Sequence, residues 1–378
     1  MRTDGAKPAW TGVSARALSC DHCRPGQRAP VGLLELLIPN RKFVMLQDVP
    51  AVDVAGRRRL RPVHVWAGLG AVFIAVQTAV YIRWIASSDF RATPTGPDHL
   101  SSTGLLMVRG FEAISTVMGV VGLIWFIRGI YKTRRIDSAR LLMLGWLSSY
   151  WLDPWLNFLT PMFTYNSAAV NRGSWAGFIP GYHSTNGNRI AEPLLINPSN
   201  YFVTFTLATF VSLWAIRTVK RRRPEAPLWL VILAGFASVW CTLSLMDLAG
   251  ALVQHIDAWP GAIQGFSIHG GHYDQFPILE LVFFPTPFVI AGYLLYRRDE
   301  NGLTAVERGS EQITGPRWKA NAARILAVVA LCNVLNLGYT TAIGTFTHYT
   351  TDHWPSDMPS YLTNEQCGGI TDITCPTR

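Results

Sequence analysis

The chain has 378 residues, of which 49% are hydrophobic, and its formal net charge is +9 at pH 7. The hydrophobic residues gather in long runs that also hold Gly and Pro, so the 32 Gly and 23 Pro do not indicate a disordered chain. The positive charge flanks these runs, which indicates contact with the anionic lipid of a bilayer and gives no reason to expect a nucleic-acid partner.

Residues 1–55 are predicted to form a disordered polar extension, rich in Pro, Gly and scattered Arg. The only apolar run in it, residues 31–38, is too short for a membrane span or for a signal peptide with its cleavage site. Cys20 and Cys23 form a CxxC pair that could bind zinc. No second pair follows, so we do not predict a metal site there.

Seven apolar windows follow, and each approaches the length of about 20 residues that a helix needs to cross a bilayer. This pattern predicts an all-α fold over residues 56–346: a polytopic membrane bundle of about seven transmembrane helices. The windows are residues 63–86, 104–127, 141–163, 200–216, 228–253, 276–296 and 324–345.

The distribution of Lys and Arg predicts the orientation of the bundle. Cations are clustered before the first window and in the loops that join windows two to three, four to five and six to seven. The other loops and the C-terminal tail, residues 347–378, carry only Arg91, Arg172, Arg189 and Arg378. Because flanking cations resist translocation, we expect a multi-pass protein of the cell membrane with a cytoplasmic N-terminus and an exterior C-terminus.

Ionisable residues inside the windows are the first candidates for function, because each costs about 2.5 kcal/mol or more in a bilayer. They lie toward the exterior ends of their windows, and we expect the carboxylates to meet around a common hollow. Arg109 could also simply neutralise its neighbour Glu112, and the carboxylates nearer the interface could merely be hydrated. The catalytic candidates are Asp153, Glu112, Asp247 and Glu280.

The third window holds the densest block of polar and aromatic residues. Tyr150, Asp153 and Asn157 follow an i, i+3, i+7 spacing, which predicts one stripe of an α-helix that faces a cavity. Pro154 lacks an N–H and should kink this helix, and Pro285 and Pro287 should break the sixth window below Glu280. The candidates for substrate binding are Arg109, Tyr150, Trp151, Trp155, Asn157, Tyr165, Asn166, Trp175 and Asn336.

The loop of residues 164–198 is the longest predicted exterior connection, and its aromatic and Asn residues suggest a lid over the cavity. The alternative is a belt of Trp and Tyr at headgroup level.

Cys367 and Cys375 on the tail could form a disulfide if that compartment is oxidising. His269 and His272 could supply half of a metal site, but the histidine boxes of membrane di-iron oxidases are absent from the sequence, so we predict no metal and no cofactor.

The segment from Trp151 to Asn157, followed by Pro161, the Tyr165-Asn166 pair and the Trp175 loop, resembles the AveC-like spirocyclase family. These are integral membrane spiroketal cyclases of avermectin-type macrolide biosynthesis in actinomycetes, used in antibiotic production. The likeness is expected to run from about residue 60 to residue 350. It implies a polyketide dihydroxy-ketone as substrate and a 6,6-spiroketal as product, and some members also act as a dehydratase on the spiroketal ring. The residues matched are Asp153, Pro154, Asn157, Tyr165 and Asn166, without assigned roles.

These observations give the hypothesis of a cofactor-independent spirocyclase. Asp153 would be the general acid or base, Glu112 held by Arg109 its electrostatic partner, and polar residues such as Asn157 would orient substrate hydroxyls. Tryptophans such as Trp155 would form apolar walls. The alternative is a proton-coupled membrane transporter of a small hydrophobic molecule, which also uses intramembrane carboxylates. The sequence does not indicate an oligomeric state.

Overall fold

The computed structural model describes residues 61–133, 136–350, 353–368, 371 and 373–375, which belong to one compact unit. The predicted N-terminal extension and its Cys20–Cys23 pair lie outside the described residues.

Five long apolar helical segments dominate the described part of the chain, and each could cross a membrane by length and composition. They confirm a mostly helical fold compatible with a membrane protein, while the number of spans and the side on which each terminus lies stay predictions. The segments are α1 (Pro62–Ile85), α2 (Ser102–Thr133), the run Asn197–Arg222, the run Leu228–Gln254, and α10 (Arg317–Thr350).

Two of these runs contain wide π-helical turns, in which the backbone holds one residue more per turn than the α-helix. The first run comprises α4 (Asn197–Ser199), the π turn η4 (Asn200–Thr204) and α5 (Phe205–Arg222). The second comprises α6 (Leu228–Val239), η5 (Trp240–Ser244), α7 (Leu245–Ala249) and η6 (Gly250–Gln254), where η5 and η6 are π turns.

The third window does not form one α-helix. Helix α3 (Ser138–Ser149) passes into a 3-10 segment, η1 (Tyr150–Asn157), which contains Pro154. The predicted stripe of Tyr150, Asp153 and Asn157 is therefore wrong. With three residues per turn, a 3-10 helix aligns the first two but rotates Asn157 by about 120° away from them. The missing N–H of Pro154 favours this change of helix type.

The sixth window is broken at its prolines, as the sequence predicts. Helix α8 (Glu280–Phe283) ends just before Pro285, which begins α9 (Pro285–Tyr296). Proline is tolerated at the first turn of a helix, where its missing N–H removes no intrahelical bond. The break keeps Glu280 on a short helix of its own, separate from the apolar α9.

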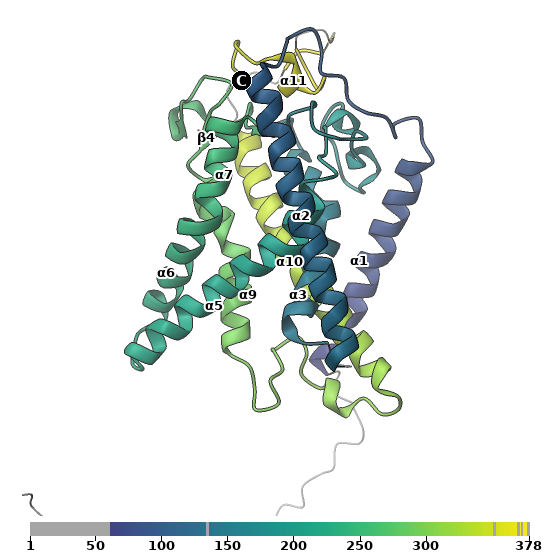
Figure 1. Ribbon diagram of the computed structural model, residues 1–378, viewed down its shortest axis with the longest axis vertical. Coiled ribbons are helices and arrows are strands. Elements are labelled where there is room, and N and C mark those ends of the chain that lie inside the picture. The colour runs from purple at the N-terminus through teal and green to yellow at the C-terminus, as the bar shows by residue number, and fades with distance from the viewer. Residues whose placement is uncertain (1–60, 134–135, 351–352, 369–370, 372, 376–378) are drawn as a thin grey trace, which may run out of the picture. The chain divides into compact units, whose positions relative to one another are not determined.

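Helix packing depends on small residues at the contacts. Helix α10 packs against α1 and α3, and α5 packs against α6 and α9 (Figure 1). At Gly70 of α1, an added Cβ would lie 2.0 Å from the carbonyl oxygen of Leu326 in α10, so only glycine permits this approach. At Gly145 of α3, an added Cβ would lie 2.7 Å from the Cys332 sulfur and 3.0 Å from the Val328 carbonyl oxygen of α10. Close backbone contact at small residues is typical of membrane helices.

The connections are ordered and carry short strands and helical turns. Strand β1 (Thr164–Tyr165) pairs antiparallel with β2 (Asp257–Ala258), with Thr164 opposite Ala258, and β3 (Ser267–Ile268) pairs with β4 (Phe276–Pro277). The remaining turns are η2 (Ala176–Phe178), η3 (Gly187–Arg189), η7 (Gln264–Phe266), η8 (Ser310–Gln312) and α11 (Ser360–Thr363). Cys367 and Cys375 form a disulfide, which confirms the predicted pairing.

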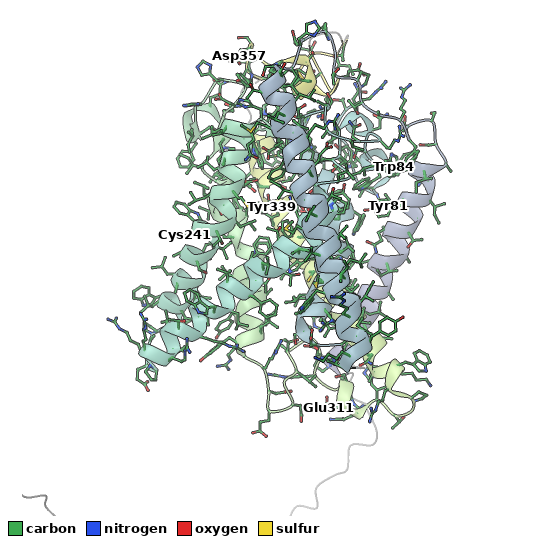
Figure 2. All side chains as sticks on the ribbon, in the orientation of Figure 1. Tyr81, Trp84, Cys241, Glu311, Tyr339 and Asp357 are labelled. Atoms are coloured by element: carbon green, nitrogen blue, oxygen red, sulfur yellow. A yellow bond between two sulfur atoms is a disulfide. The ribbon has the colours of Figure 1, made fainter. Side chains whose placement is uncertain are left out.

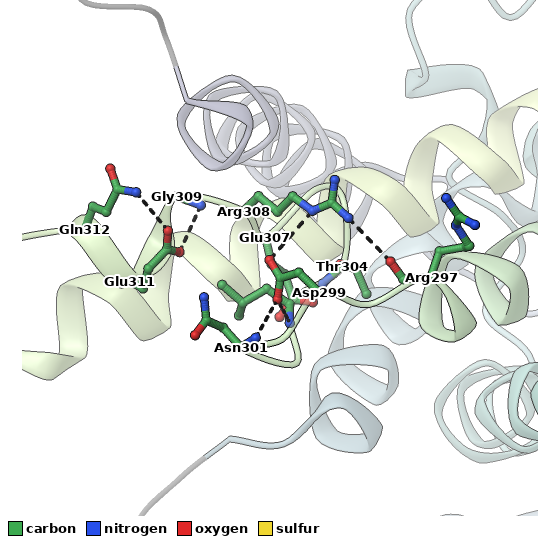
Figure 3. Close-up of polar contacts among 10 residues, drawn as sticks. Arg297, Asp299, Asn301, Thr304, Glu307, Arg308, Gly309, Glu311 and Gln312 are labelled. Atoms are coloured by element: carbon green, nitrogen blue, oxygen red, sulfur yellow. Dashed lines mark hydrogen bonds and ion pairs between the residues drawn. The ribbon is translucent and has the colours of Figure 1, made fainter. Parts of the chain in front are cut away.

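The cationic connection between α9 and α10 is held by its own polar contacts (Figure 3). The Arg308 side chain reaches the Asp299 carboxylate at 3.7 Å and the Arg297 carbonyl at 3.4 Å. Glu307, which is buried, accepts hydrogen bonds from Thr304 and from Arg324 of α10. In Figure 1 this connection and the one between α5 and α6 lie at the end opposite β4 and α11, which is the alternation that the cation pattern predicts.

Candidate functional site

Carboxyl groups from four separate elements line a cavity of about 120 Å³. These are Asp153 of η1, Asp247 of α7, Asp257 of β2 and Glu280 of α8. Aromatic side chains complete the lining, including Tyr339 of α10, which Figure 2 shows among the packed helices. The sequence predicts Asp153, Asp247 and Glu280 around a common hollow, and the structure brings these three together.

Asp153 is buried, and three side-chain donors hold its carboxyl group. The Tyr165 hydroxyl donates to Oδ2 at 2.6 Å, the Tyr201 hydroxyl donates to Oδ1 at 2.7 Å, and the Asn197 amide donates to Oδ2 at 3.2 Å. Burial, and then the negative charge of Asp153, raise the pKa of the Tyr165 phenol, so this hydroxyl keeps its proton and acts as a donor. Such a carboxyl can exchange a proton with a ligand while its position stays fixed.

These donors come together because distant parts of the chain pair at the site. Tyr165 is held by the β1–β2 pairing. Asn197 begins α4, and Tyr201 lies four residues later in the π turn η4. Of the substrate-binding candidates, Tyr165 alone lines the cavity within the described residues. Tyr201 and Asn197 are not among the sequence candidates, because nothing near them in the sequence marks them as partners of Asp153.

Glu192 is a further buried carboxyl that the sequence pattern does not single out. Its side chain is fully buried, and neither oxygen has a donor within hydrogen-bond geometry among the described residues. The side chains within reach are the Asp153 carboxyl and the Asn197 amide. Burial, and then the charge of Asp153, raise the pKa of Glu192 well above its usual range. It lies in the loop of residues 164–198, outside every apolar window, which explains why an argument from intramembrane charge does not find it.

Three further carboxyl groups of the lining each have an oxygen without a hydrogen-bond partner among the described residues: Asp247 Oδ2, Asp257 Oδ1 and Glu280 Oε2. The second oxygen of Glu280 accepts a hydrogen bond from the Tyr339 hydroxyl. Burial, and then the charge of Asp247, raise the pKa of Asp257 well above its usual range. Asp257 follows the end of the fifth window and looks like an ordinary loop residue in the sequence.

The described residues contain no group of three or more His, Cys, Asp or Glu side chains arranged to hold a metal ion. His269 pairs with Asp274 at 3.1 Å, and His272 pairs with Asp357 at 3.2 Å, on an exposed part of the surface. The carboxyl and hydroxyl groups that line the cavity can transfer protons, form hydrogen bonds to hydroxyls and stabilise positive charge.

Glu112 lies outside the cavity lining, although the sequence hypothesis places it there. One oxygen pairs with Arg109 at 2.6 Å, and the other accepts from the backbone N–H of Val170 at 2.6 Å. Glu112 therefore joins α2 to the loop of residues 164–198. Spacing alone cannot distinguish this role from a catalytic one, because an ion pair between residues three apart has the same pattern in both cases.

The tryptophan candidates form a hydrogen-bonded wall around η1. Trp151 donates to Asn333 at 2.7 Å, Trp155 donates to Thr341 at 2.9 Å, and Trp175 donates to the Trp151 carbonyl at 2.7 Å. This wall joins η1 to α10 and to the loop of residues 164–198. None of these tryptophans lines the cavity, so they act by holding η1, the segment that carries Asp153.

The other polar candidates bind backbone groups or pack. Asn157 Oδ1 accepts from the N–H groups of Met162 and Phe163, both at 2.8 Å, and so stabilises the turn after η1. Asn166 and Asn336 donate to backbone carbonyls. The Tyr150 hydroxyl has no hydrogen-bond partner in the described part of the chain, and its ring centroid lies 5.0 Å from that of Trp175. These contacts hold the backbone around the site, and none of these four side chains lines the cavity.

We expect Glu112→Gln to retain turnover within about twofold, because the amide oxygen still accepts from Val170 while the half-exposed ion pair with Arg109 contributes about 1 kcal/mol or less. Thermal unfolding in detergent and a turnover assay measure the two effects. A loss of turnover as large as that of an Asp153 variant would return Glu112 to the chemistry.

The model of the family described as spirocyclase AveC-like matches residues 133–362. The chain belongs to the AveC-like spirocyclase family. This confirms the resemblance, but the match begins at the end of α2, whereas the sequence comparison was expected to extend back to about residue 60. No curated protein and no solved structure gives a significant match. The four carboxyl groups of the cavity and Glu192 all lie inside the AveC-like segment, and membership of the family suggests a role in spiroketal formation.

Proposed function

We propose that this protein is a cofactor-independent spirocyclase that converts a dihydroxy-ketone polyketide, a macrolide intermediate, to a 6,6-spiroketal. The observation that carries the proposal is the Asp153 carboxyl, which lines the pocket, is held by two tyrosine hydroxyls, and shares that pocket with three further carboxyl groups. Family membership supplies the reaction class, and the pocket supplies groups that such a reaction needs.

The reaction forms and breaks C–O bonds with the help of proton transfers and has no redox step. One substrate hydroxyl adds to the ketone and gives a hemiketal. Protonation of the hemiketal hydroxyl lets its C–O bond break, and water leaves with the bonding electrons. The second hydroxyl forms a C–O bond with the resulting oxocarbenium ion and releases its proton. The proton delivered to the leaving water is thus recovered, so the reaction balances without an oxidant or a reductant, and Asp153 is the group that we assign to both transfers.

The other carboxyl groups would act on the charge and the hydroxyls of the substrate. The partnerless oxygens of Asp247, Asp257 and Glu280 can accept hydrogen bonds from substrate hydroxyls, and an ionised member would stabilise the oxocarbenium ion. Phe163 and Trp259 give the same pocket apolar walls, which exclude bulk water that would compete with the second hydroxyl.

The cavity is small for a macrolide. Its volume of about 120 Å³ is below the roughly 300–1,000 Å³ of pockets that enclose a drug-sized ligand. We therefore propose that the reacting ketone segment alone enters it. The apolar remainder would lie against the bundle or in lipid, and a place in the cell membrane would suit a substrate that partitions into the bilayer.

The test is turnover by the purified protein in detergent with an open-chain dihydroxy-ketone macrolide, followed by mass spectrometry. The expected product is lighter than the substrate by one water, and loss of a second water would add dehydratase activity. Recovery of unchanged substrate after incubation, with accumulation of that substrate inside vesicles that contain the protein, would replace the proposal with transport.

A further inference from the structure

Glu192 is placed where an ionised carboxylate would be unstable. It is fully buried, and no donor in the described chain reaches either of its oxygens within hydrogen-bond geometry. Burying an unpaired negative charge costs much more than burying a neutral carboxyl group. Its position therefore favours the protonated form, which needs an acceptor for its O–H.

Asp153 is the acceptor within reach. The side chains of Glu192 and Asp153 lie within hydrogen-bonding distance of each other, and Asn197 lies beside both. Two carboxyl groups in contact can form a hydrogen bond only when one of them is protonated. The other titratable groups that interact with Glu192 are tyrosines, which are neutral when protonated: Tyr81, Tyr150, Tyr165, Tyr182 and Tyr201.

A residue of the C-terminal tail connects the two halves of this pair. Asn364 is fully buried, its Nδ2 donates to the Tyr165 carbonyl at 2.7 Å, and its Oδ1 accepts from the Ala191 N–H at 2.9 Å. Tyr165 holds Asp153, and Ala191 directly precedes Glu192. One side chain thus fixes the backbone on both sides of the carboxyl pair.

We propose that Glu192 is a positioning residue that shares a single proton with Asp153, and that Asn364 holds the two carboxyl groups at hydrogen-bonding distance from each other. The inference rests on the proposed function, in which Asp153 must be able both to give and to take a proton. Glu192 does not line the cavity, so it acts through Asp153 and does not contact substrate.

The shared proton gives Asp153 the two states that ring closure needs. When Asp153 donates to the hemiketal hydroxyl, the pair passes from one shared proton to none, and the C–O bond breaks as water leaves. When the second hydroxyl attacks the cation, its proton returns to Asp153 and the pair regains one proton. Because removing the shared proton puts two negative charges side by side, the pair keeps it to a higher pH than a single carboxyl would.

Glu192→Gln tests the shared proton. The amide keeps the size of the side chain and can donate to Asp153, but it cannot give up a proton. Without the like-charged neighbour, Asp153 should lose its proton at a lower pH. The alkaline limb of the turnover-against-pH profile should therefore move to lower pH by about one unit or more. An alkaline limb that stays in place while turnover is retained overturns the proposal.

Infrared difference spectroscopy on the intact protein in lipid gives a readout that does not depend on turnover. At neutral pH the wild type should show a C=O stretching band of a protonated carboxyl group that Glu192→Gln lacks. Bands of the other buried carboxyl groups are common to both proteins and cancel in the difference spectrum between them. If the wild type makes no spiroketal but this band is lost, the proposed function fails and the shared proton stands. If the band persists in Glu192→Gln, the shared proton is overturned, including the case in which the variant is inactive at every pH.

Asn364→Gly and Asn186→Gly test the tether as a matched pair. Both asparagines have a left-handed backbone, with φ of 51° and 48°, which glycine adopts without strain. Both connect the tail to the loop of residues 164–198, but Asn186 binds the carbonyls of Glu365 and Gln366, away from the carboxyl pair. We expect Asn364→Gly to lower kcat about tenfold with little change in KM, and Asn186→Gly to stay near wild type. Equal losses in both variants overturn the tether.

Discussion

Asp153→Asn should lower turnover about 1,000-fold while the protein stays folded. The amide has nearly the same size. Its oxygen can accept a hydrogen bond from one of the two tyrosine hydroxyls, Tyr165 or Tyr201, and its NH2 group can donate to the other, but it cannot carry the proton that water departure requires. Mass spectrometry of the product measures the loss under single-turnover conditions, so that slow product release does not hide the effect. Retention of more than about a tenth of the wild-type rate would remove Asp153 from the proton transfers.

Glu307→Gln is the matched control for this change. Glu307 is as buried as Asp153 and has its own hydrogen-bond donors, but it lies in the connection before α10, remote from the cavity lining. Its replacement should lower the unfolding temperature through the weakened pairing with Arg324 and leave turnover per folded molecule unchanged. The comparison separates loss of a buried carboxylate in general from loss of this one.

Gly70→Val should destabilise the fold by about 3 kcal/mol or more. The Cβ would lie 2.0 Å from the Leu326 carbonyl oxygen, and this neighbour is backbone, which cannot rotate away as a side chain can. Helix α1 would have to move away from α10 along their shared contact. Unfolding of the detergent-solubilised protein, followed by circular dichroism against temperature, measures the effect.

Gly68→Val provides the control in the same helix. It is two residues earlier and exposed, and an added Cβ would meet nothing within 4 Å. The two substitutions carry the same loss of helix propensity, so their difference reports the α1–α10 contact alone. Equal unfolding temperatures for the two variants would show that α1 does not depend on this approach.

The apolar windows predicted the helical fold because membrane-length hydrophobic runs leave little alternative to helices. They also pointed to Asp153, Asp247 and Glu280, which line the cavity, because an ionisable residue inside an apolar run is costly and is therefore easily recognised in the sequence. Glu192 and Asp257 were missed because they lie in loops, where charge is ordinary. They reach the site only through long-range contacts, the β1–β2 pairing and the tail residue Asn364, which no local pattern encodes.

The error at Glu112 has a different origin. Its pairing with Arg109 was predicted correctly, but sequence spacing does not reveal which way a helix faces. The Val170 N–H, 58 residues further along the chain, donates a hydrogen bond to Glu112 and directs its side chain toward the loop of residues 164–198. The stripe expected over η1 failed because a period of 3.6 was assumed where Pro154 favours a period of three.

The π turn η4 changes which side of the helical run Asn197–Arg222 faces the interior, so that the residues before and after the turn point in different directions. One additional residue in a turn shifts the helical phase by about 100°, since each residue of an α-helix advances by that angle. Tyr201 can therefore point at Asp153 while Thr209, two turns later, meets Trp146 in the interior. Loss of a single residue from this turn would hardly change the length and hydropathy of the helix but would turn the Tyr201 phenol away from the Asp153 carboxyl that it holds.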